Sequence, residues 1–321
     1  MEKTKLCAYG PEISRLTLGT MMFGKTVDSA QADRIVGLAL DAGINSIDTA
    51  GTYNNGQSEI MTGKALTGRR SEVILASKVG YPLTGGIESV DLSANAVISE
   101  TEAALKRLGT DYLDILYLHA PDRSVPAAET LAAADELVRS GKVRYLGVSN
   151  YSAWELTELM WVSDREKLAP ISVTQNIYNV LSRRVEAELA PCVKHFGLGM
   201  TVYNPLAGGM LTGKYSGTEA TSGRLSWNAM YKERFLNEAN LDAVRQLGDI
   251  ARENSMSLIE LSYRWCLSRD FISSMLIGVS SYEQLEANLK CCKFEKLSED
   301  ILECCEKQWQ ALRGASPDYA R

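Results

Sequence analysis

The sequence predicts an α/β protein folded as a single (β/α)8 barrel, and three observations support this fold class. Strand and helix signals alternate along most of the chain with no break in composition, as the eight units of a barrel require. Polar residues or glycine recur where the predicted strands end, as expected when all strands open onto one mouth. The main rival is a doubly wound sheet, but no Gly-x-Gly-x-x-Gly separates the first strand from its helix. We expect one domain covering residues 1–321.

The elements follow in a regular order. A β-hairpin is predicted at residues 5–16, around Gly10-Pro11, ahead of the barrel. Barrel strands are predicted at residues 16–20, 44–48, 73–78, 113–119, 143–149, 171–175, 199–203 and 274–278. Helices are predicted at residues 28–42, 58–66, 93–108, 127–140, from 152, 184–196, 258–268 and 282–291.

Three regions interrupt this order. The first is residues 81–91, which hold Gly85-Gly86. Residues 204–240 form a connection much longer than usual, which favours a lid or a binding loop over a plain connector. An extra helix is expected after it, at residues 241–253. A further helix is expected after the barrel, at residues 298–313.

Composition excludes several classes of partner. The chain has 321 residues, of which 45% are hydrophobic and 23% are charged, which is typical of a soluble globular protein. A net charge of −6 argues against a nucleic-acid or an anionic-membrane partner. No apolar run is long enough to predict a membrane span, and the N-terminus lacks the apolar core of a signal peptide.

The seven cysteines are an odd number with no Cys-x-x-Cys spacing, which favours reduced thiols in the cytoplasm. Two vicinal pairs, Cys291-Cys292 and Cys304-Cys305, cannot easily bind one tetrahedral ion, so no metal site is expected.

Four residues suggest proton-transfer chemistry. Asp48, Lys78 and His119 stand at the ends of three consecutive predicted strands, and Tyr53 lies in the loop after Asp48. A nearby ammonium lowers the pKa of a phenol, so Lys78 would make Tyr53 a usable acid, with Asp48 anchoring Lys78. His119 could donate to a carbonyl oxygen. Because no second carboxylate or metal cluster accompanies them, an external hydride donor is the simplest electron source.

A structural interpretation stays open beside this one. His119 could be a core histidine with satisfied hydrogen bonds, and Lys78 with Asp48 could be a structural ion pair. The other strand ends favour the chemical interpretation, because they also offer polar side chains or glycine: Ser149 with Asn150, Gln175, Tyr203 and Gly278.

Residues 208–215 nearly match a phosphate-binding P-loop. The residue after Lys214 is tyrosine, so the hydroxyl that ligates Mg²⁺ is absent and hydrolysis of nucleoside triphosphates is disfavoured. The glycines and Lys214 could instead approach a dinucleotide pyrophosphate.

These residues resemble the aldo-keto reductase superfamily over essentially the whole chain. Asp48, Tyr53, Lys78 and His119 match its catalytic tetrad. Four strings are similar to its aflatoxin-aldehyde and succinic-semialdehyde reductase branch: Tyr117-Leu-His-Ala-Pro-Asp122, Asn204-Pro-Leu-Ala-Gly-Gly-Met-Leu-Thr-Gly-Lys-Tyr215, Gly223-Arg224 and Pro317-Asp-Tyr-Ala-Arg321.

The resemblance implies an NADPH-dependent reductase of aldehydes and some ketones, acting on small-molecule carbonyl substrates, with a homodimer as one arrangement. It implies that Ser149, Asn150 and Gln175 hold the nicotinamide carboxamide and that Tyr203 stacks on its ring. The remaining implied cofactor residues are Asn204, Leu206, Gly208, Lys214, Arg224, Gly278, Ser280, Gln284 and Asn288. The implied substrate residues are Met22 and two arginines for a substrate carboxylate, Arg234 and Arg321.

The chain departs from the family pattern at two places. Ala287 stands where many members carry an acidic residue for the adenine amine, and Ser280-Ser281 stand where many NADPH-specific members carry a basic side chain. NADH therefore remains open as a cofactor. The alternative function is that of a nucleotide-binding regulatory subunit, like the potassium-channel β-subunits of the same superfamily.

Overall fold

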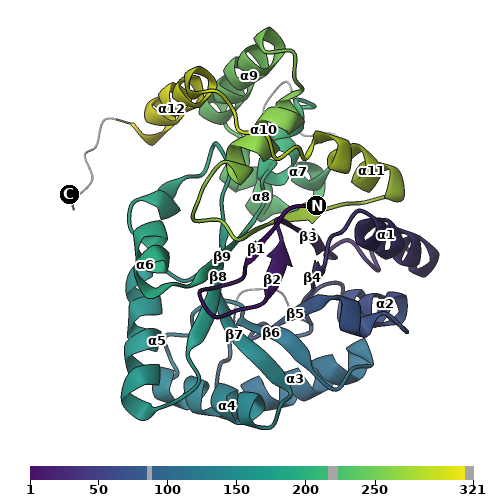
Figure 1. Ribbon diagram of the computed structural model, residues 1–321, viewed down its shortest axis with the longest axis vertical. Helices are drawn as coiled ribbons and strands as arrows, with labels where there is room; N and C mark the ends of the chain where they lie inside the picture. Colours follow the sequence, from purple (N-terminus) through teal and green to yellow (C-terminus); the bar gives the residue numbers. More distant parts are fainter. Residues whose placement is uncertain (85–88, 216–222, 315–321) are drawn as a thin grey trace.

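The computed structural model describes residues 1–84, 89–215 and 223–314, and it contains a closed barrel of parallel strands (Figure 1). Around the barrel the strands follow the order β10-β3-β4-β5-β6-β7-β8-β9. They are β3 (Leu16–Gly19), β4 (Ser46–Asp48), β5 (Ile74–Val79), β6 (Leu113–Leu118), β7 (Val143–Ser149), β8 (Ile171–Ile177), β9 (Gly199–Tyr203) and β10 (Ser274–Gly278). The predicted (β/α)8 barrel is confirmed.

Helices alternate with these strands and surround the barrel in Figure 1. They are α1 (Ser29–Asp41), α2 (Gln57–Ala65), α3 (Ala94–Leu108), α4 (Ala127–Arg139), α5 (Ala153–Glu166), α6 (Leu189–Phe196), α10 (Leu258–Leu267) and α11 (Tyr282–Cys291). The predicted extra helices correspond to α9 (Glu238–Glu253) and α12 (Glu299–Arg313), which lie beside each other at the top of Figure 1. A short 3-10 helix, η1 (Arg70–Glu72), precedes β5.

The helix ends follow local side-chain chemistry. The Asp28 carboxylate accepts a hydrogen bond from the Gln31 backbone N–H and begins α1. Ser152 and Glu155 form a capping box at the start of α5. Gly109 ends α3 in the left-handed region, with a φ of 64°. These signals lie within a few residues of each boundary, which is why the sequence predicts the boundaries well.

The prediction of one continuous helix at residues 184–196 is wrong. The structure has a 3-10 helix, η2 (Arg184–Glu186), followed by the separate helix α6. Pro191 lies in the first turn of α6, where its missing N–H costs nothing. Farther inside a helix its ring would clash with the carbonyl of residue 187, so the helix cannot extend back through that residue.

The connection predicted at residues 204–240 contains helices where it is described. They are η3 (Ala207–Thr212), α7 (Arg224–Trp227) and α8 (Ala229–Phe235). Residues 216–222 lie outside the described part. Helix α9 also begins earlier than predicted, because Asn237 caps it by accepting from the Asn240 N–H.

The predicted hairpin closes one end of the barrel. Its strands are β1 (Lys3–Lys5) and β2 (Glu12–Ser14), which pair antiparallel. Leu6 and Ile13 of the hairpin pack against Ile74, Ile115 and Val173 of the barrel. A Cβ on Gly199, the first residue of β9, would lie 1.8 Å from the Leu6 carbonyl oxygen, so the contact requires glycine. The open mouth is therefore at the other end, where the strands finish.

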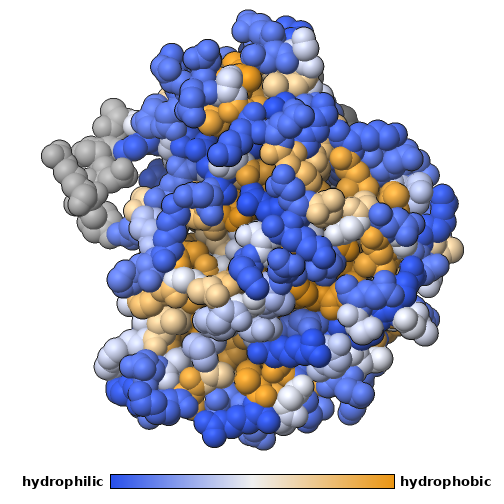
Figure 2. All heavy atoms as spheres, viewed as in Figure 1, coloured by the Kyte–Doolittle hydropathy of each residue, from blue (hydrophilic) through white to orange (hydrophobic). Residues whose placement is uncertain are grey.

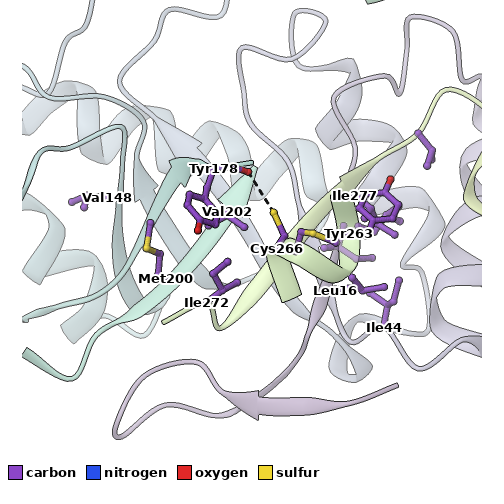
Figure 3. Packing of buried hydrophobic residues seen from close by; sticks show 14 of the residues in the cluster. Leu16, Ile44, Val148, Tyr178, Met200, Val202, Tyr263, Cys266, Ile272 and Ile277 are labelled. Carbon is purple, nitrogen blue, oxygen red and sulfur yellow. Dashed lines mark hydrogen bonds between the residues drawn. The ribbon is translucent and has the colours of Figure 1, made fainter. Parts of the chain in front are cut away.

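The main core lies between the barrel and the surrounding helices. Figure 3 shows residues of this core, including Met200 of β9 and, near Cys266 of α10, Val202 of β9. The Cys266 thiol lies 3.8 Å from the carbonyl oxygen of Tyr178, whose ring stacks on Trp265 at 5.1 Å. On the outer surface, hydrophilic residues cover most of the face in Figure 2, with hydrophobic residues between them.

Among the described residues, none of the helices combines the length and the apolar character needed to cross a lipid bilayer.

Candidate active site

The backbone of the loop after β4 places Tyr53 at the open mouth. Asn54, Asn55 and Gly56 follow it with φ of 51°, 53° and 80°, three consecutive residues in the left-handed region. Asparagine and glycine tolerate this conformation better than other residues. The Asn54 amide also donates to the carbonyls of Met21 and Phe23, 2.8 and 2.7 Å away. The loop is thereby tied to the segment after β3.

Lys78 is the centre of the predicted tetrad. Its ammonium forms a buried ion pair with Asp48. It also donates to the Thr49 carbonyl at 2.9 Å and lies 3.3 Å from the Tyr53 hydroxyl. The other Asp48 oxygen accepts from the Gln175 amide at 2.8 Å. The structure therefore brings together Asp48, Lys78 and Tyr53, as the sequence predicts.

Burial and charge oppose each other in this cluster. Burial lowers the pKa of Lys78, but Asp48 and Tyr53 raise it by more, so the net pKa lies above its usual value. Burial raises the pKa of Tyr53, and Lys78 lowers it by less, so the net pKa also lies above its usual value. Lys78 therefore acts on the phenol's pKa in the direction that the sequence predicts, but in this structure desolvation outweighs the charge. Both groups are protonated at neutral pH.

His119 directly follows β6 and faces two tyrosine rings. Its ring centroid lies 6.1 Å from that of Tyr53 and 4.8 Å from that of Tyr81, both edge to face. Burial, with a smaller contribution from Lys78, lowers the pKa of His119 well below its usual value, so the imidazole is neutral. Its Nδ1 is buried and has no hydrogen-bond partner within the described part of the chain.

The residues predicted to hold the carboxamide lie together. The Tyr203 hydroxyl donates to the Asn150 amide oxygen at 2.6 Å, and the Asn150 amide donates to the His119 carbonyl at 2.9 Å. The Ser149 hydroxyl donates to the Gln175 carbonyl at 3.0 Å. These contacts join the ends of β6, β7, β8 and β9 into one polar wall beside the tetrad.

A second group of predicted residues lies in the segment from Asn204 to Arg224. The Asn204 amide donates to the Tyr231 hydroxyl at 2.9 Å. Gly208 has a φ of 66°, and a Cβ there would lie 2.9 Å from the Tyr231 ring. The Arg224 guanidinium lies 5.1 Å from the Tyr231 ring centroid, and Leu206 packs against the main core.

Lys214 lies in a cradle of small residues. A Cβ on Gly209 would lie 3.5 Å from the Lys214 Nζ, and one on Gly223 would lie 2.4 Å from it. The Tyr215 hydroxyl is also against Gly223, and it is buried without a hydrogen-bond partner among the described residues. A cation, an orphaned hydroxyl and glycines with positive φ together suit an anionic ligand.

The residues predicted for the adenosine end lie around the start of α11. The Gln284 amide oxygen accepts from the backbone N–H and the hydroxyl of Ser280, at 2.6 and 3.0 Å. Asn288 is buried on the same helix, and Gly278 ends β10 and is exposed. Arg34 of α1 lies over the Tyr282 ring at 4.4 Å. The basic side chain that is missing at Ser280-Ser281 is therefore present nearby, on another helix.

The predicted substrate residues have different outcomes. Arg234 on α8 is exposed, 5.9 Å from the Tyr231 ring centroid, and its charge acts on the hydroxyl of Tyr203. Met22 is buried and packs in the main core. Arg321 lies outside the described residues.

Two tyrosines at the mouth, Tyr81 and Tyr231, were missed by sequence reasoning. Tyr81 follows Lys78 by three positions, and Tyr231 precedes Arg234 by three positions on the same helix. These spacings from candidate residues are the signals that could have identified them. Within the described residues, no group of three His, Cys, Asp or Glu side chains could hold a metal ion.

Comparison with known proteins adds an independent finding. The model of the Aldo/keto reductase family matches residues 15–309. The rat protein named aflatoxin B1 aldehyde reductase member 2 is 34% identical over 323 residues, covering 95% of this chain and 87% of its own. Human aldo-keto reductase family 7 member A3 is 32% identical, covering 95% and 96%. A probable voltage-gated potassium channel subunit beta from Arabidopsis thaliana is 35% identical over 300 residues, covering 90% of both chains.

Proposed function

The chain belongs to the aldo/keto reductase family and is an NAD(P)H-dependent oxidoreductase, and we propose that it reduces aldehydes, and some ketones, to alcohols. The observation that carries the proposal is the 3.3 Å contact between the Lys78 ammonium and the Tyr53 hydroxyl at the open mouth. The name of the rat relative, an aflatoxin B1 aldehyde reductase, supports aldehydes as the substrate class.

The chain's residues suit a dinucleotide. Asn150 and Gln175 would hold the carboxamide, and the Tyr203 ring would lie against the nicotinamide. The Lys214 cradle, with the orphaned Tyr215 hydroxyl, would hold the pyrophosphate. We propose NADPH as the preferred donor, because the Ser280 hydroxyl and the Gln284 amide can bind a 2′-phosphate, and NADH remains possible.

When bound, the reduced nicotinamide supplies the hydride that adds to the carbonyl carbon. Tyr53 donates its proton to the carbonyl oxygen as negative charge develops there. The phenolate that forms lies beside the Lys78 ammonium, which stabilises it. Neutral His119 donates an N–H to the same oxygen and orients the carbonyl. Because Tyr53 is protonated at neutral pH, the proton is present before the reaction begins.

Two finer proposals concern substrate and location. Arg234 would bind a carboxylate on the substrate, because its guanidinium lies at the mouth near Tyr203 and Tyr231. All seven cysteines are free thiols, which supports a reducing, cytoplasmic location.

The proposal is tested by following NADPH oxidation with 4-nitrobenzaldehyde and with succinic semialdehyde. The wild type should turn over both. Tyr53→Phe should lower kcat by about 10²- to 10⁴-fold, because it removes the proton donor. The Kd for NADPH should stay within about twofold of the wild-type value. The substitution removes a single hydroxyl, and that hydroxyl does not belong to the residues proposed to hold the carboxamide. A variant that loses cofactor binding instead would contradict the acid role.

The similarity to the potassium-channel relative from Arabidopsis supports a second candidate function, that of a nucleotide-binding regulatory subunit. That function predicts tight NADPH binding without turnover of either aldehyde. Steady turnover by the wild type excludes it as the main activity.

A further inference from the structure

One buried carboxylate lies between the elements that carry Lys78 and Tyr53. Glu59 of α2 is fully buried. One of its oxygens accepts from the Ser77 hydroxyl at 2.6 Å, and Ser77 directly precedes Lys78 on β5. The other accepts from the Arg107 Nε at 2.5 Å, in the last turn of α3. A single side chain therefore links the strand of Lys78 to an arginine on another helix.

Arg107 lies directly on the loop of Tyr53. A Cβ on Gly51 would lie 3.1 Å from the Arg107 Nη2, and a Cβ on Gly56 would lie 2.8 Å from its Cδ. Gly51 and Gly56 stand on either side of Tyr53. Because both are glycine, the arginine side chain rests against the loop backbone at both places.

The Glu59 ion pair holds Arg107 in this position. A cavity of about 260 Å³ lies on one side of Arg107, bounded also by Lys78, Tyr81 and Glu100. A side chain next to an open cavity has fewer packing contacts to fix its rotamer. The charged hydrogen bond to Glu59 is therefore the main restraint on the Arg107 guanidinium.

We propose that Glu59 and Arg107 are positioning residues that fix the separation of Tyr53 from Lys78. The connection runs from β5 through Ser77, Glu59 and Arg107 to the Tyr53 loop. This positioning role rests on the proposed function, since the separation of Tyr53 from Lys78 matters only if Tyr53 donates a proton. A small displacement of a reacting group lowers kcat far more than it changes ligand affinity.

The test compares Arg107→Lys with a matched control, Arg70→Lys. Arg70 pairs with buried Asp114 near the start of β6, and the two side chains are 18% and 6% exposed, against 21% and 0% for Arg107 and Glu59. Both lysine variants keep a cation beside the carboxylate and lose the branched group. Because Asp114 keeps a second ion pair with Arg144 at 2.8 Å, we expect Arg70→Lys to lower the Tm no more than Arg107→Lys does. Only Arg107→Lys should lower kcat, by about tenfold or more, with the Kd for NADPH unchanged.

The pH profile separates a positioning role from a general loss of stability. Lys78 acts to lower the pKa of Tyr53. If Tyr53 moves away from Lys78, the alkaline limb of the pH–rate profile for aldehyde reduction should shift to higher pH in Arg107→Lys. The same limb should stay at the wild-type pH in Arg70→Lys.

A second pair of variants tests the other half of the connection. Ser77→Ala removes the hydrogen bond to Glu59 and should also lower kcat. Ser46→Ala, a buried serine on β4 that accepts from Thr17, should not. Because Ser77 and Arg107 act through the same carboxylate, the effects of Ser77→Ala and Arg107→Lys on kcat should not be additive.

The outcomes distinguish this inference from the proposed function. Suppose that the wild type reduces aldehydes, that Tyr53→Phe abolishes reduction, and that Arg107→Lys keeps kcat within about twofold of the wild type. The positioning role is then wrong, and the proposed function stands. If the wild type does not reduce aldehydes, the function fails and the inference fails with it.

Discussion

The Tyr53 hydroxyl is acted on by burial and by Lys78 in opposite directions, and the balance defines its chemistry. Burial is the larger effect, so the phenol holds its proton at neutral pH. Lys78 therefore acts mainly after the proton has left, by stabilising the phenolate. The same ammonium is held by Asp48 and the Thr49 carbonyl, so it cannot follow a displaced tyrosine without losing those contacts.

Arg234 offers a prediction at the scale of one side chain. Arg234→Ala should raise the KM for succinic semialdehyde by about tenfold, because a charged hydrogen bond is worth about 1.5–3 kcal/mol. The KM for 4-nitrobenzaldehyde, which has no carboxylate, should change little. Steady-state kinetics on both aldehydes measure the difference. Equal changes in both KM values would remove the carboxylate role from Arg234.

The tetrad could be predicted from the sequence because three of its members end consecutive strands. A barrel brings such residues to one mouth whatever the details of packing. Tyr81 and Tyr231 could not be placed in the same way, since they reach the site from a loop and from helix α8, whose positions depend on contacts between distant segments. The net pKa of Tyr53 also depends on burial, which the sequence does not specify.

Helices α2 and α3 approach each other closely at Gly63. A Cβ there would lie 2.1 Å from the Leu108 carbonyl oxygen, which is backbone and cannot move aside easily. Gly63→Ala should therefore lower the free energy of unfolding by about 1–3 kcal/mol, the usual cost of overpacking. Urea unfolding measures this change.

Gly248 of α9 is the matched control for this prediction. Apart from its chain neighbours and the backbone of its own helix, no atom of the described residues lies within 4 Å of the position of its Cβ. Gly248→Ala should raise the free energy of unfolding by up to about 1 kcal/mol, because alanine favours a helix more than glycine does. If both variants unfold at the wild-type urea concentration, the close approach at Gly63 is not a real constraint.

Most elements could be predicted from the sequence because their caps and periodicity are local. The exceptions are instructive. Pro191 is visible in the sequence, yet the apolar pattern continues across it and suggests one helix where there are two. Helix α8 is short and depends on burying Tyr231 and Phe235 against the rest of the protein, so its own residues give a weak signal.

The partly buried His119 makes the stability of the whole molecule depend on pH. His119 has a depressed pKa when folded and a pKa of about 6.5 when unfolded. Below about pH 6.5 the imidazole binds a proton in the unfolded chain but not in the folded chain. The contribution of His119 to the free energy of unfolding is therefore fully present above about pH 6.5 and is lost as the pH falls. His119→Asn should reduce the loss of stability between about pH 7.5 and 5.5. The urea midpoint at the two pH values measures it.

His195 is the control for this effect, because it is the only other histidine and is exposed on α6. His195→Asn should leave the pH dependence of the urea midpoint as in the wild type. The same dependence in all three proteins would show that carboxylates alone cause it.

The pairing of β3 with β10 has a consequence for synthesis. The first barrel strand leaves the ribosome early, but its second neighbour, β10, emerges only after all the other barrel strands. Until then the edge of β3 that pairs with β10 has no partner strand. The nascent chain should therefore be a client of chaperones until late in translation, and ring closure should be its slow step.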